Sequence, residues 1–145
     1  MDELTFRGWT VKFDFDATRS EYSKAPIGAA EQCGCLECQN FIAARNLGLV
    51  YPDEIIRLFH TLGIDVAREC ELYSIGKVAT GRHEYGGWFD VVGRIIRDEN
   101  QSTEITADFE LIPVVRPGPF TPSQGFPEPS FRLEFQVNVP WVLNR

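Results

Sequence analysis

Several stretches of the chain alternate apolar and polar residues with the period of two that half-buried β-strands show. The alternation is clearest over residues 131–139, where five apolar residues interleave with four polar ones. Residues 85–97 carry apolar side chains in both phases, which is typical of a central strand buried on both faces. Weaker patterns over residues 72–78 and 107–115 predict two further strands.

The N-terminal alternation, over residues 4–15, changes phase at Gly8. A one-residue slip in a period-two pattern is the mark of a β-bulge, and glycine suits such a position. We therefore predict one bulged strand here. Residues 16–31 are mostly polar or small and include Pro26 and Gly28, so they predict a loop.

Two helices are predicted between the N-terminal strand and the other strands. The first covers residues 35–47 and ends at Gly48. The second begins near Pro52, carries acidic residues in its first turn and ends at Gly63. Its apolar residues follow the i, i+3, i+4, i+7 spacing of an amphipathic helix; they are Ile55, Leu58, Phe59 and Leu62.

The order of these elements is a strand, two helices and then a run of strands. It predicts an α+β fold, with a twisted, mainly antiparallel sheet of about five strands and two consecutive helices packed on one face. A chain of 145 residues matches the usual size of a single domain, here residues 1–145. At this size about two-thirds of the unfolded surface is buried on folding, so neither a metal nor a disulfide is needed for a core.

The formal net charge is −7, and no run of basic residues occurs. Binding to nucleic acid or to an anionic membrane requires clustered lysine and arginine, so we expect neither partner. The sequence begins Met1-Asp2-Glu3, without the basic and apolar segments of a signal peptide. We therefore expect a soluble cytoplasmic protein, whose thiols stay reduced.

Three of the four cysteines fall within six residues: Cys33, Cys35 and Cys38. With Cys70 as a fourth ligand, or His83 as the next choice, they fit a zinc site, although the spacing is not the usual pair of pairs. Cys35 and Cys38 also form a C-x-x-C at a helix start, where the helix dipole favours a reactive thiolate. The third interpretation is burial, because cysteine is among the most buried residue types.

The segment from Gly81 to Trp88 is a second candidate site. His83 suits proton transfer near neutral pH, and Glu84 could orient it or act beside it. Together with Cys35 these residues define an alternative catalytic set. A hairpin turn with an incidental histidine explains the same residues.

A third candidate is the segment 116–130, which is rich in proline and glycine. The stretch from Pro119 to Pro122 fits the P-x-x-P pattern of polyproline ligands, and a stiff loop that covers a sheet edge explains it equally. The candidate binding surface consists of Tyr85, Trp88, Pro119 and Phe120.

The motif residues resemble those of a set of small uncharacterised bacterial proteins. The resemblance covers about residues 33–96 and rests on a C-x-x-C-x-N-F motif at 35–41, L-G-I-D at 62–65, Y-G-G-W-F at 85–89 and V-G at 92–93. It implies a bacterial protein and brings no activity, cofactor or catalytic residue.

The sequence therefore predicts a small protein-binding domain without catalysis, with a partner protein and zinc as its candidate ligands. The alternative is a metal- or thiol-dependent enzyme that combines the three-cysteine cluster with His83 and Glu84.

Overall fold

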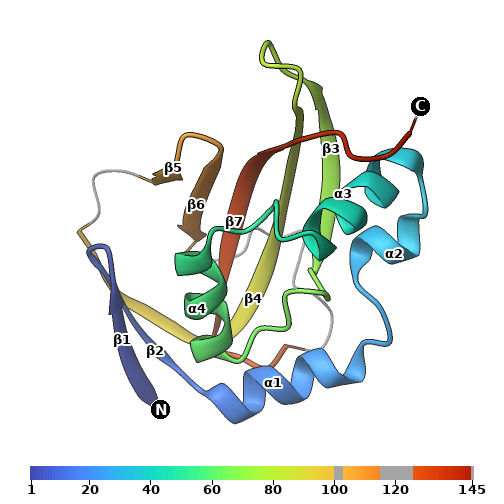
Figure 1. Cartoon of the computed structure of the whole chain (residues 1–145). Helices are drawn as coiled ribbons and strands as arrows, with labels where there is room; N and C mark the ends of the chain where they lie inside the picture. Colours follow the sequence, from blue (N-terminus) through green and yellow to red (C-terminus); the bar gives the residue numbers. More distant parts are fainter. Residues whose placement is uncertain (100–102, 115–125, 145) are drawn as a thin grey trace.

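The protein is described by a computed structural model that covers residues 1–99, 103–114 and 126–144. The segment 115–125, which contains Pro119 and Phe120, lies outside the described residues, so the proposed binding loop stays a prediction. Within the described ranges, one sheet packs against helices (Figure 1). No helix of this part of the chain is long and apolar enough to span a membrane.

The helices are α1 (Phe15–Lys24), α2 (Ala29–Cys33), α3 (Leu36–Asn46) and α4 (Asp53–Leu62). The strands are β1 (Asp2–Phe6), β2 (Trp9–Phe13), β3 (Glu71–Lys77), β4 (His83–Asp98), β5 (Glu104–Thr106), β6 (Phe109–Val114) and β7 (Ser130–Val139).

The sheet runs in the order β1-β2-β4-β7-β6-β5, and β3 pairs with β4. All of these pairings are antiparallel. The predicted α+β class with a mainly antiparallel sheet is confirmed, and β4 is its central strand, because it pairs with β2, β3 and β7. The predicted number of about five strands is wrong, because the described residues form seven.

One extra strand comes from the N-terminal segment, which is a hairpin rather than one bulged strand. Arg7 and Gly8 both have positive φ (45° and 87°), as the two central residues of a type I′ turn require. Phe6 faces Trp9 across this turn. Directly paired residues share a face of the sheet, so the phase change at Gly8 is the signature of the turn.

The predicted loop over residues 16–31 is also wrong, because helix α1 and most of α2 lie there. The side chain of Asp14 caps α1 by accepting a hydrogen bond from Ala17 N at 2.9 Å. Thr18 and Tyr22 form the buried side of α1. Both bind the sheet through hydroxyl groups, so α1 lacks the apolar stripe that sequence patterns detect.

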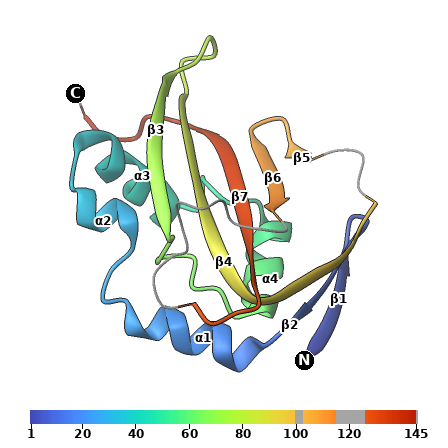
Figure 2. The same ribbon diagram turned by 180° about the vertical axis from the view of Figure 1, so that it is seen from behind.

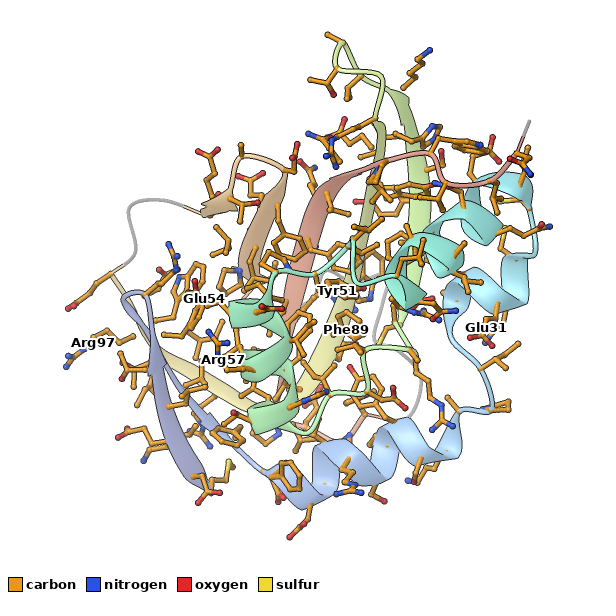
Figure 3. All side chains as sticks on the ribbon, in the orientation of Figure 1. Glu31, Tyr51, Glu54, Arg57, Phe89 and Arg97 are labelled. Atoms are coloured by element: carbon orange, nitrogen blue, oxygen red, sulfur yellow. The ribbon has the colours of Figure 1, made fainter. Side chains whose placement is uncertain are left out.

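The two predicted helices are confirmed as α3 and α4, and both lie on the same face of the sheet (Figures 1 and 2). The core lies between them and the strands, where Tyr51 and Phe89 occupy the centre (Figure 3). Their rings are 6.0 Å apart, and both contact Phe59 and Phe135. In the figures α1 runs along one end of the sheet, and α2 lies beside β3.

Candidate metal centre

Cys33, Cys35 and Cys38 meet where α2 joins α3, and their sulfur atoms all lie within 4.8 Å of one another. Cys33 is the last residue of α2, and Cys35 is the N-cap of α3. Gly34 connects them with a left-handed backbone at φ 69°, which closes α2 and turns the chain into α3. The cluster is therefore built into a helix-to-helix junction.

The three thiols differ in exposure. Cys33 and Cys35 are exposed, whereas Cys38 is buried. The burial interpretation thus fits Cys38 and fails for the other two. The Cys35 sulfur accepts a hydrogen bond from Cys38 N at 3.4 Å, so it already serves as a cap for the helix.

The surroundings also separate the pKa values of the thiols. The pKa of Cys33 is lowered, mainly by a hydrogen bond from the backbone of Cys35 and then by hydrogen bonds from the Cys35 and Cys38 side chains. Burial raises the pKa of Cys38, and its side-chain hydrogen bonds raise it further. One exposed thiol therefore ionises more readily than usual, and the buried one less readily.

Cys70 does not belong to this group. Among the described residues, the group of potential ligand atoms contains only the three clustered cysteines. The Cys70 sulfur lies 3.6 Å from the Tyr22 hydroxyl oxygen, and its backbone N–H donates to Trp88 O. The structure therefore places the proposed fourth ligand beside α1 and β4 instead of in the cluster.

A buried polar network fixes α3 against the sheet and against the C-terminal segment. The Tyr85 hydroxyl donates to Glu37 O at 2.6 Å, in the first turn of α3. Asn40, fully buried, donates to Pro140 O at 3.2 Å and accepts from Val142 N at 2.8 Å. Asn40 Nδ2 also lies 3.4 Å from the Tyr85 hydroxyl oxygen. The motif residues Asn40 and Tyr85 thus hold the helix that carries Cys38.

Glu69 holds α2 in place through its buried carboxylate. One carboxylate oxygen accepts from Ala30 N at 2.7 Å, and the other lies 3.3 Å from an Arg45 guanidinium nitrogen of α3. Arg45 also pairs with Glu31 of α2 at 3.6 Å; Figure 3 labels Glu31 on this helix. The carboxylate and the arginine together join α2 to α3, the two helices whose junction holds the cysteines. Burial raises the pKa of Glu69.

His83 and Glu84 do not form an acid–base pair. They are successive residues of β4, and successive side chains of a strand point to opposite faces. His83 Nε2 lies 2.6 Å from the Ser74 hydroxyl oxygen, and its ring is 5.0 Å from that of Tyr85. Neither His83 nor Glu84 belongs to the described cysteine group.

The expected binding surface is also corrected in part. Tyr85 is fully buried, so it belongs to the core instead of a surface. Trp88 is partly exposed and lies under the Arg132 guanidinium, whose carbon is 4.2 Å from the ring centroid. Arg132 in turn forms a buried ion pair with Asp90 at 3.0 Å.

Lack of space for a side chain explains the two glycines of the Y-G-G-W motif. A Cβ on Gly86 would lie 2.5 Å from the Tyr73 ring, and one on Gly87 would lie 2.3 Å from Glu71 O. Both positions lie opposite β3. The motif is therefore explained by strand packing, and this explanation needs no ligand.

Sequence reasoning missed Gly34 and Glu69 as residues that shape the site. Gly34 had a visible signal, since a glycine between two candidate ligands marks a turn. Glu69 had none, because a buried glutamate looks like any surface glutamate in a sequence. No family model, curated protein or solved structure matches this chain. The resemblance to small bacterial proteins therefore stays a prediction.

Proposed function

We propose that this chain is a small protein-binding domain that binds a zinc ion through Cys33, Cys35 and Cys38, without catalysis of its own. The observation that carries the zinc site is the meeting of three thiols within 4.8 Å at one helix junction. Thiolates are preferred ligands of Zn²⁺, and sets of three or four cysteines are common in structural zinc sites.

The distances support an ion of this size. With Zn–S bonds of about 2.3 Å, tetrahedral geometry places the sulfur atoms roughly 3.8 Å apart. The separations of up to 4.8 Å thus close by about 1 Å at most. Cys33 and Gly34 are exposed, and nothing lies within 4 Å of a Cβ placed on Gly34, so this side of the site has room to adjust.

Two observations favour binding over catalysis. His83 and Glu84, the proposed acid–base residues, point to opposite faces of β4. In contrast, the apolar side chain of Leu36, which directly follows Cys35, is 50% exposed. Exposed apolar residues beside a structural site are suited to contact a partner.

The zinc site is tested by elemental analysis of the full chain, purified without chelator or metal resin, together with thiol titration. We expect about one zinc per chain, and the exposed thiols of Cys33 and Cys35 should react only after chelation. In the Cys35→Ser variant the zinc should be lost, while serine still caps α3. The matched control is Cys70→Ser, which should keep the metal; equal zinc in parent and Cys35→Ser would contradict the proposal.

The proposed binding of a partner protein is tested by comparing affinity capture by the parent with capture by a Leu36→Asp variant. A protein enriched by the parent and lost with the variant supports this surface. Equal capture by both would show that the surface beside the cysteines binds nothing.

A thiol-redox enzyme is the second candidate, because Cys35 is an exposed N-cap and Cys38 is a buried neighbour one turn on. This pair could exchange with a substrate disulfide, which would be reduced as Cys35 and Cys38 become oxidised to a disulfide. Metal-free protein that forms a Cys35–Cys38 disulfide in a glutathione buffer would favour it over the zinc site.

A further inference from the structure

We infer that the fourth ligand of the metal comes from outside this chain, and that it is a histidine imidazole of a partner polypeptide. The inference rests on the proposed zinc site. It assigns the partner a direct bond to the metal, so that the junction of α2 and α3 is an intermolecular metal site.

Among the described residues, no fourth ligand atom joins the three thiols at this junction. Among the described histidines, cysteines, aspartates and glutamates, the group around the cysteines ends at three. The segments outside the description, 100–102 and 115–125 together with position 145, contain none of these four residue types. Cys70 is engaged beside Tyr22, and His83 beside Ser74. A tetrahedral zinc held by the three thiolates therefore has one open position.

The open position faces solvent. Cys33 and Cys35 are exposed, and only Cys38 is buried, so an ion between the three sulfurs would be covered from the side of α3 alone. A Cβ on Gly34 would meet nothing within 4 Å. Leu36, half exposed, follows directly after Cys35. A partner side chain can therefore reach the metal without displacing any part of this fold.

Charge selects imidazole over thiolate or carboxylate. Three thiolates and one Zn²⁺ carry a net charge of −1, and the two helices that meet at the site carry acidic residues in their first turns, Glu31 in α2 and Glu37 in α3. The whole chain adds a formal net charge of −7. An anionic fourth ligand would increase this repulsion, whereas neutral imidazole would not. A site of three cysteines and one histidine is also an established zinc coordination set.

The experiment replaces zinc by Co²⁺ in the full chain, because the visible ligand-field bands of cobalt report its fourth ligand. We expect bands of tetrahedral cobalt with thiolate charge transfer, and a saturable shift of these bands when imidazole is added. A histidine-containing peptide should produce the same shift, and a peptide with histidine replaced by alanine should not. Bands that imidazole leaves unchanged, in protein dilute enough that the bands no longer depend on its concentration, would overturn the inference.

Variants identify where the fourth ligand comes from. If Cys70→Ser alters the cobalt bands of the parent, the chain closes its own site and the inference is wrong. The bands of the parent and of His60→Ala are also compared on dilution. If dilution weakens the bands of the parent but not those of His60→Ala, the imidazole comes from a second copy of this chain. His60 is the exposed histidine among the described residues.

Failure of the zinc site itself would look different. In that case Co²⁺ would give no thiolate charge-transfer band with the parent, and Cys35→Ser would not differ from it. If cobalt binds the thiolates but imidazole does not shift its bands, the proposed zinc site stands and only the external ligand is wrong.

Discussion

Cys35 has two structural tasks, because its sulfur caps α3 and also belongs to the cysteine cluster. A metal would bind the same sulfur atom that accepts the backbone N–H of Cys38. Serine can cap the helix but is a poor zinc ligand, so Cys35→Ser separates the two tasks. This is why the variant is a better probe than alanine, which would remove both.

Tyr85 tests how firmly the cysteine-bearing helix is held. In Tyr85→Phe the ring stays in the core, but Glu37 O loses its donor and Asn40 loses a contact. We expect the free energy of unfolding to fall by about 1–3 kcal/mol, the usual cost of leaving a buried group unpaired. Urea unfolding measures this loss; Tyr73→Phe, on an exposed ring, is the control and should change little.

The raised pKa of Glu69 predicts that the free energy of unfolding depends on pH. Its pKa is raised by burial, so the folded chain holds this proton at higher pH than the unfolded chain does. The stability that the proton contributes is present below the unfolded pKa and is lost as pH rises through the folded pKa. Glu69→Gln should therefore gain stability relative to the parent as pH rises from about 4.5 towards neutrality.

The measurement is a series of urea unfolding curves of parent and Glu69→Gln across that range. Only the difference between the two proteins matters, because Glu54, whose pKa is lowered by Arg7, contributes a trend of opposite sign to both. A difference that stays constant with pH would contradict the expected role of Glu69.

At the scale of elements, prediction succeeded where burial is apolar and periodic. Helix α4 and strand β7 bury one apolar face each, and both appear in the sequence as a clean stripe. Helix α1 binds the sheet through the hydroxyls of Thr18 and Tyr22, so its sequence looks like a loop. The turn between β1 and β2 was missed for another reason. A two-residue turn and a bulge shift the phase of the alternation in the same way.

The candidate site was predicted in part for the same reason. The density of cysteines is visible in the sequence, and the structure brings three of them together. His83 and Glu84 diverge because they are successive residues of β4, which begins two residues before the strand predicted from residue 85. That Cys70 lies elsewhere depends on how β4 and α1 pack. Such long-range placement leaves no local signal in the sequence.

At Gly93, strand β4 passes from its pairing with β7 to its pairing with β2, and this position gives the next prediction. Gly93 has φ 148°, and a Cβ there would lie 2.0 Å from Lys12 O of β2. Gly93→Ala should therefore separate β2 from β4 and destabilise the protein by more than about 3 kcal/mol. Gly48 is the control. Its φ is 76°, and an added Cβ would meet nothing within 4 Å, so a substitution there introduces backbone strain without a collision.

We expect Gly48→Ala to cost only about 1–2 kcal/mol, since a left-handed alanine is strained but does not collide. Thermal unfolding of both variants gives the comparison. Equal losses would show that the strands tolerate the extra methyl group, contrary to the tight packing of β2 on β4.

For the whole molecule, the metal should stabilise the fold only modestly. The three ligands lie within six residues, so an unfolded chain retains part of the affinity for zinc, and binding to the unfolded state reduces the stabilisation. The core lies elsewhere, around Tyr51 and Phe89. Chelation should lower the melting temperature by only roughly 2–8 °C, which corresponds to about 1–2 kcal/mol at this size.

Calorimetry with and without chelator checks this expectation, and Cys35→Ser should melt like the chelated parent. Complete unfolding on chelation would mean that the ion organises the core as it does in a zinc finger.

The position of β7 in the sheet bears on how the chain folds as it is synthesised. This strand lies between β4 and β6, yet it is translated after both. Helices α3 and α4 thus leave the ribosome before β7, and Phe41 of α3 lacks its ring contact with Phe135 until residues 130–139 emerge. Chains stalled on the ribosome before this segment should be cut rapidly by protease and held by chaperones, whereas chains stalled well beyond it should resist cleavage.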